Sequence, residues 1–187
     1  MKQNKTFIWS LVIMIVVASL YRVIPNRPFG FAPQLALALF SGAVFKDKKY
    51  AFLLPLISMF ISDLIYQVLY MAGVTPIYGF YQGMVFNYIL CASVTVFGLL
   101  MKRLRVMNIL AASLAAPTYF FIVSNFFTWL GVGFFVEYPK TWEGLMECYV
   151  AGIPFYKNSL MATMVFSAVL FGSWYLINRK AAKPITI

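Results

Sequence analysis

The chain has 187 residues, of which 63% are hydrophobic and only 11% are charged, whereas about a quarter of the residues in soluble globular domains are charged. This composition excludes a soluble domain and predicts an all-α protein, a polytopic bundle of six transmembrane helices that forms a single integral membrane domain over residues 1–187. The formal net charge of +10 arises from short basic clusters between apolar runs, so it indicates membrane topology and not nucleic-acid binding.

Six apolar runs predict the membrane spans, at residues 7–23, 34–45, 50–71, 82–101, 107–130 and 159–177. The first run follows two lysines, as in a signal peptide, but residues 20–22 make a poor cleavage site, which favours an uncleaved span. The second run would form a helix of roughly 18 Å, which is too short for a hydrocarbon core of about 30 Å. We expect either that residues 29–31 dip into the membrane or that the helix begins below its surface and leaves room for a pocket.

The basic residues indicate the orientation. If the six spans alternate, then all of the 15 Lys and Arg residues except Arg22, Arg27, Lys140 and Lys157 lie on one side of the membrane. Because cytoplasmic loops carry an excess of Lys and Arg, both termini are predicted to be cytoplasmic, in a multi-pass protein of the inner (plasma) membrane. Residues 142–153 have the spacing of an amphipathic helix at the outer interface that Pro154 ends. This helix either anchors at headgroup depth or caps a pocket.

Asp63 is the one acidic residue inside a predicted span. A charge there costs at least about 2.5 kcal/mol unless it is paired or hydrated. About 14 residues separate it from the cytoplasmic end of its span, roughly 20 Å, which places it in the outer half of the membrane. Two roles remain open: an ion pair with Arg22 or Arg27 that fixes a loop on the bundle, and direct contact with a substrate.

Amide and aromatic side chains from other spans reach a similar depth and converge on the same half of the bundle. We expect the substrate to be bound by Asp63, Tyr66, Gln67, Asn87, Asn125, Trp129 and Asn158, because small-molecule sites combine apolar walls with a few polar groups. For Asn87 and Asn125 the alternative is hydrogen bonding between helices. The unpaired N–H groups at residues 32–35 could hold a ligand carboxylate or carbonyl.

Residues 22–33 connect the first two spans above this region. We expect this segment to act as a gate through Arg22, Arg27, Phe29 and Phe31. Below it, Ala38 and Gly42 form a pair of small residues four positions apart, which allows close helix approach. The pair either packs inside the bundle or docks a partner membrane protein.

Features of enzymes and metal proteins are missing from the sequence. There is no histidine, and the two cysteines have no metal-binding spacing. Neither a phosphate-binding glycine loop nor a nucleophile beside a base is present. We therefore expect no catalytic residues, no metal and no cofactor, and energy for transport would come from a partner or an ion gradient.

Four segments carry a resemblance to known proteins: RVIPNRPFGFAPQLALALFSGAVF, FISDLIYQ, SNFFTWLG and CYVAGIPFYKNSL. They resemble an uncharacterised family of six-span transport proteins, which in turn is similar to the substrate-binding S components of energy-coupling-factor vitamin transporters. The resemblance implies six helices, cytoplasmic termini, a substrate pocket under the first loop, and docking to a transmembrane coupling protein that works with ATPases.

The leading hypothesis is therefore a membrane protein that binds a small, partly polar organic molecule for uptake, of the vitamin or cofactor-precursor class. A scaffold that organises other membrane proteins is the second hypothesis. A membrane enzyme is the third, because the five acidic residues and the absence of histidine leave few catalytic choices.

Overall fold

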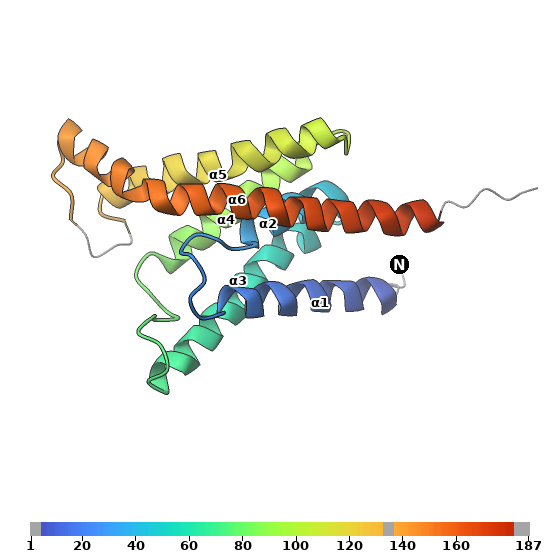
Figure 1. The fold of residues 1–187 in the computed structure, drawn as a ribbon, viewed down its shortest axis with the longest axis horizontal. Helices are drawn as coiled ribbons and strands as arrows, with labels where there is room; N and C mark the ends of the chain where they lie inside the picture. The colour runs from blue at the N-terminus through green and yellow to red at the C-terminus, as the bar shows by residue number, and fades with distance from the viewer. Residues whose placement is uncertain (1–4, 133–136, 182–187) are drawn as a thin grey trace, which may run out of the picture.

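The computed structural model describes residues 5–132 and 137–181 (Figure 1). Within this part of the chain the protein is all-α, with six helices and no strand. The helices are α1 Lys5–Arg22, α2 Gln34–Val44, α3 Lys48–Met71, α4 Met84–Leu99, α5 Val106–Trp129 and α6 Trp142–Ala181.

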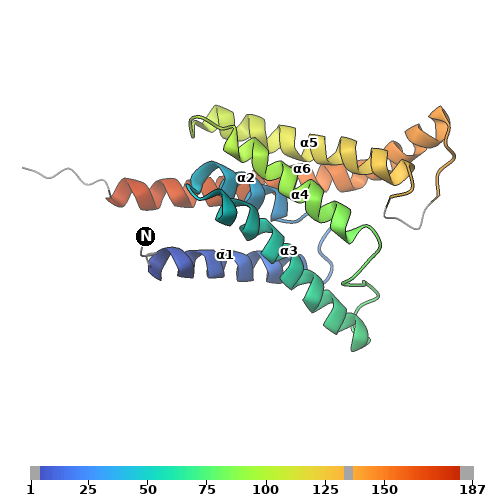
Figure 2. The same ribbon diagram turned by 180° about the vertical axis from the view of Figure 1, so that it is seen from behind.

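The helices run back and forth along the long axis, so the connections gather at two ends. Figures 1 and 2 show residues 23–33, 72–83 and 137–141 at one end, which we name the loop end. The short connections α2–α3 and α4–α5 lie at the opposite end, with the start of α1 and the end of α6. We name this the basic end, because basic residues lie in these connections and in the first turn of α3: Lys46, Lys48, Lys49, Lys102, Arg103 and Arg105.

The short helix α2 lies at the centre of the bundle. Its residues from Gln34 to Gly42 are all buried, and it packs against α3, α4, α5 and α6. The closest approach is to α4, where Gly42 faces the backbone of Thr95 and Gly98 faces the backbone of Leu39. Ala38 has no exposed surface. Ala38 and Gly42 thus pack inside the bundle and leave no surface for a partner protein.

Three helices in the described part of the chain are long and apolar enough to cross a bilayer, which indicates a multi-pass membrane protein: Lys48–Met71, Val106–Trp129 and Trp142–Asn178. The prediction of six spans is therefore corrected: three of the described helices have the length and composition of a membrane span. The other apolar helices, Trp9–Arg22, Gln34–Val44 and Met84–Leu99, are shorter. At 1.5 Å per residue, α2 and α4 reach only about 17 and 24 Å, less than the about 30 Å of the hydrocarbon core.

The prediction that Pro154 ends a separate helix is wrong. α6 is one helix of 40 residues with Pro154 inside it, and Figures 1 and 2 show its first turns inclined to the rest. Packing against a neighbouring helix makes such a proline tolerable, and here the Tyr149 hydroxyl donates to the Ile122 carbonyl of α5 (2.8 Å).

The first part of α6 packs inward through small residues. Gly144, Cys148 and Gly152 are buried, whereas Trp142 is 72% exposed and Val150 is 64% exposed. In a lipid environment large apolar side chains gain nothing by facing another helix, and small residues allow the backbones to approach. The exposed apolar residues are therefore consistent with lipid contact.

Candidate functional site

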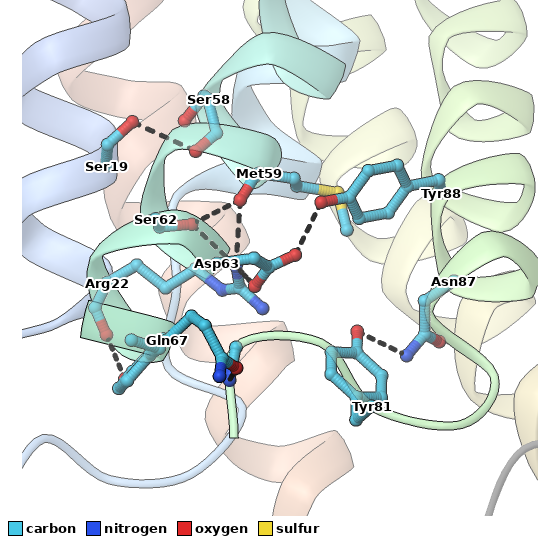
Figure 3. A network of polar contacts seen from close by, with 12 residues as sticks. Ser19, Arg22, Ser58, Met59, Ser62, Asp63, Gln67, Tyr81, Asn87 and Tyr88 are labelled. Atoms are coloured by element: carbon cyan, nitrogen blue, oxygen red, sulfur yellow. Dashed lines mark hydrogen bonds and ion pairs between the residues drawn. The ribbon is translucent and has the colours of Figure 1, made fainter. Parts of the chain in front are cut away.

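The buried carboxylate Asp63 is paired with Arg22, the last residue of α1 (Figure 3). Asp63 is 1% exposed, and one of its oxygens accepts from the Arg22 guanidinium. The other oxygen, Oδ2, accepts from the Tyr88 hydroxyl of α4 (2.5 Å). Arg22 also donates to the Ser62 Oγ (2.5 Å) and to the Met59 carbonyl (3.3 Å). This network ties α1, α3 and α4 together and offsets the desolvation of both charges.

Arg27 instead holds the backbone of the α1–α2 loop. Its Nε donates to the Arg22 carbonyl (3.1 Å), which also accepts from the Tyr66 hydroxyl (2.6 Å). Its Nη1 donates to the Phe31 carbonyl (2.5 Å). The predicted choice between Arg22 and Arg27 as the partner of Asp63 is thus decided for Arg22.

The same loop is attached to α6. The Asn158 Nδ2 donates to the Phe29 carbonyl (2.8 Å). Gly30 has a φ of +82°, and a Cβ there would lie 2.6 Å from the Phe155 carbonyl oxygen. Glycine is therefore required for this close contact. The Phe31 ring lies 5.9 Å, centroid to centroid, from that of Phe166.

A large cavity of about 480 Å³ lies between the helices and is partly open to the outside. All six helices contribute to its wall, for example through Arg22, Gln34, Met59, Asn87, Phe121 and Cys148. Ala32 and Leu35 also line it, so the start of α2 borders the cavity as the sequence suggested for residues 32–35. Its volume falls within the about 300–1,000 Å³ of small-molecule pockets.

A smaller cavity of about 340 Å³ lies at the loop end and is lined by Arg27, Phe29, Asp63 and Tyr66, among others. Arg22 and Tyr81 line both cavities, so they stand between the two. Burial raises the pKa of the Tyr81 hydroxyl, which keeps it protonated at neutral pH. That hydroxyl accepts from the Asn87 Nδ2 (3.0 Å) and retains its own proton for donation.

The seven predicted binding residues do not form one site. Asn87 and Asn125 line the large cavity, whereas Asp63 and Tyr66 border the small one. The other three are bonded to backbone: the Gln67 Oε1 accepts from the Gly79 and Phe80 amides, the Trp129 indole donates to the Pro139 carbonyl, and Asn158 holds the α1–α2 loop.

Several cavity residues were missed from the sequence. Three of them, Pro117, Phe121 and Ser124, share one face of α5 with Thr128, at intervals of three or four positions. That periodicity was visible in the sequence. Gln34 was also missed, although a polar residue at the start of a short apolar helix is a signal in itself. Within residues 5–132 and 137–181, no cluster of His, Cys, Asp or Glu could hold a metal ion.

The fold and the cavity define a class: a multi-pass, all-α membrane protein with a pocket bordered by every helix. Within that class, the chain belongs to the family described as "Family of unknown function (DUF6580)", whose model matches residues 2–184. No curated protein and no solved structure matches the chain. These comparisons give no link to energy-coupling-factor transporters, so that resemblance remains an expectation.

Proposed function

We propose that this protein binds a small, partly polar organic molecule within the membrane for uptake, and that the molecule occupies the large cavity. The observation that carries the proposal is that cavity of about 480 Å³, walled by all six helices. Its wall combines aromatic rings with a few amide and hydroxyl groups, among them Phe120, Phe121, Asn87, Asn125 and Ser124. Small-molecule sites have this composition, in which polar groups fix the orientation of a ligand in an apolar pocket.

The cavity, and not Asp63, is the proposed binding site. Asp63 already accepts from Arg22 and Tyr88, so its charge is neutralised without a ligand. The pair instead supports the helices around the cavity, and Arg22 supplies part of the cavity wall. The predicted gate loop would then open or close a path between the small and the large cavity.

The direction of uptake follows from the distribution of charge. The basic end would face the cytoplasm and the loop end the exterior of an inner (plasma) membrane, with both termini cytoplasmic. The helices α1, α2 and α4 would cross the bilayer together with loop residues, because irregular backbone is tolerated at membrane depth where it is buried in protein or lines a cavity.

The resemblance to S components supplies the remaining parts of the proposal. The substrate would be a vitamin or cofactor precursor, and a transmembrane coupling protein with ATPases would supply the energy. The partner would dock elsewhere than on Ala38 and Gly42, which are buried.

Filling the cavity is expected to remove a bound molecule. Ser124 lines the cavity, and its hydroxyl donates only to the Phe121 carbonyl of its own helix, so Ser124→Phe adds a ring without breaking a contact between helices. Wild type purified in mild detergent should retain a small molecule that mass spectrometry detects, and Ser124→Phe should lose at least about nine-tenths of it.

The matched control is Ser173→Phe, at an exposed position of α6 that is not part of the cavity wall. It should retain the molecule at the wild-type level. Equal retention by Ser124→Phe and Ser173→Phe, or no molecule in wild type, would contradict the proposed site. If wild type carries no molecule but recruits other membrane proteins, the scaffold hypothesis takes its place.

A further inference from the structure

Gln34 is a buried amide that has no hydrogen-bond partner among the described residues. It is the first residue of α2, it is 6% exposed, and it lies in the wall of the large cavity. Within the described part of the chain, neither its Nε2 nor its Oε1 has a hydrogen-bond partner. Buried polar side chains are nearly always hydrogen-bonded, and an unpaired one destabilises the fold. A ligand in the cavity would supply the missing partner.

The two other amide side chains in the cavity wall, unlike Gln34, are hydrogen-bonded to the protein. The Asn87 Nδ2 donates to the Tyr81 hydroxyl (3.0 Å), and the Asn125 Nδ2 donates to the Phe121 carbonyl (2.8 Å). Their amide nitrogens therefore already have protein partners. In this wall, the amide of Gln34 therefore has both its donor and its acceptor available for a ligand.

The chemistry of a primary amide restricts what can satisfy it. A glutamine side chain offers an N–H donor beside a carbonyl acceptor, and it pairs in a bidentate way with a planar group that has an acceptor beside a donor. An amide, lactam or imide edge of a ring meets this requirement. A carboxylate does not, because it offers only acceptors and would leave the Oε1 without a donor.

The remainder of the wall favours a flat ligand. Phe120, Phe121, Phe155 and Tyr156 all line the cavity, and the rings of Phe121 and Tyr156 are stacked at 4.7 Å between centroids with an angle of 28°. Flat aromatic molecules pack favourably against such faces and edges. An aromatic wall with one unpaired amide therefore suits a ring system with a polar edge.

We propose that Gln34 determines specificity for the ligand. Its amide would form two hydrogen bonds with the edge of a planar, uncharged ring that carries an N–H beside a C=O, as in a lactam or imide. This proposal rests on the proposed function and names the chemical class of the molecule in the cavity. The ring would stack on the aromatic residues, and its N–H and C=O would satisfy the Gln34 Oε1 and Nε2.

The test uses two probes that differ at one atom position. Phenanthridinone is a planar three-ring lactam, and its N-methyl derivative lacks the N–H donor. Binding to the full-length protein in detergent is measured by the fluorescence of each probe. Wild type should bind phenanthridinone about tenfold or more tightly than the methylated probe, which corresponds to one bidentate pair.

Gln34→Leu should bind both probes with similar affinity. This variant breaks no hydrogen bond to the described part of the chain, so its folding should be preserved, as its melting temperature will show. Gln82→Leu is the matched control, because Gln82 lines the small cavity only, and it should keep the wild-type preference. The inference is overturned if Gln34→Leu still prefers phenanthridinone over the methylated probe. It is also overturned if wild type shows no such preference or binds neither probe.

The two proposals can fail separately. A co-purified molecule that Ser124→Phe loses but Gln34→Leu retains at full affinity leaves the cavity as the binding site and overturns the role of Gln34. If neither variant changes the amount of a co-purified molecule, the binding site lies elsewhere and both proposals fail.

Discussion

Replacing Asp63 by alanine is expected to destabilise the folded protein by about 3–5 kcal/mol. The substitution leaves the Arg22 guanidinium without its anion at a position where the side chain is 17% exposed, and it also removes the acceptor of the Tyr88 hydroxyl. Arg22 then keeps its hydrogen bonds to Ser62 and Met59 but carries an uncompensated charge, and the Tyr88 hydroxyl loses its acceptor. The free energy of unfolding, measured by denaturant titration in detergent micelles, tests this expectation.

Two controls separate the ion pair from a general effect of losing a carboxylate. Glu143→Ala removes an exposed acidic residue at the start of α6 and should change stability by no more than about 0.5 kcal/mol. The double variant Arg22→Met with Asp63→Leu should lose less than the sum of its two single variants, because neither charge is left alone. Additive losses in this pair would show that the two side chains do not stabilise each other.

Replacing Gly42 by valine is expected to cost about 3 kcal/mol or to prevent folding altogether. A Cβ at this position would lie 2.2 Å from the Thr95 carbonyl oxygen and 3.0 Å from the Leu99 amide nitrogen. Both are backbone atoms, so the helices α2 and α4 must move apart. Because α2 borders the large cavity, any folded fraction should also bind less ligand. The yield of monodisperse protein and its melting temperature measure the effect.

Gly172→Val is the matched control for this substitution. Gly172 also lies within a helix, α6, but a Cβ there would meet no atom within 4 Å. The control should therefore melt within a few degrees of wild type. If Gly42→Val is tolerated as well as Gly172→Val, the close contact between α2 and α4 does not exist.

Much of the helix arrangement could be predicted from apolar runs and basic clusters. The start of α2 at Gln34 and the end of α3 at Met71 match the expected limits. The errors lie where packing overrides a local signal. Pro154 stays within α6 because α5 supports that helix, and α4 ends at Leu99 before the apolar run does. Neither effect can be predicted from the sequence of the helix alone.

The candidate site was predictable only in part. The sequence showed that Asp63 needed a partner, and the structure identifies Arg22 as that partner. It also indicated Asn87 and Asn125, which line the cavity. The sequence showed Gln34 as a polar residue at the start of a short apolar helix, but only the structure shows that its amide is unpaired, because that requires knowing all its neighbours. A cavity likewise depends on how six helices leave space between them.

The two cavities connect the charged pair with the proposed binding site. Arg22 contributes to the wall of both cavities and is held by Asp63. Tyr81, which also borders both, bonds to Asn87 at the large cavity. A molecule that enters at the loop end would therefore pass these two side chains before it reaches Gln34.

The proposal that a small molecule occupies the large cavity can be tested by a high-resolution cryo-EM map. The wild-type protein is purified from its own membrane without added ligand and imaged in lipid nanodiscs. We expect a flat non-protein density that contacts Gln34 and stacks near Phe121. A cavity filled by the protein's own side chains, or only by a lipid acyl chain, would contradict it.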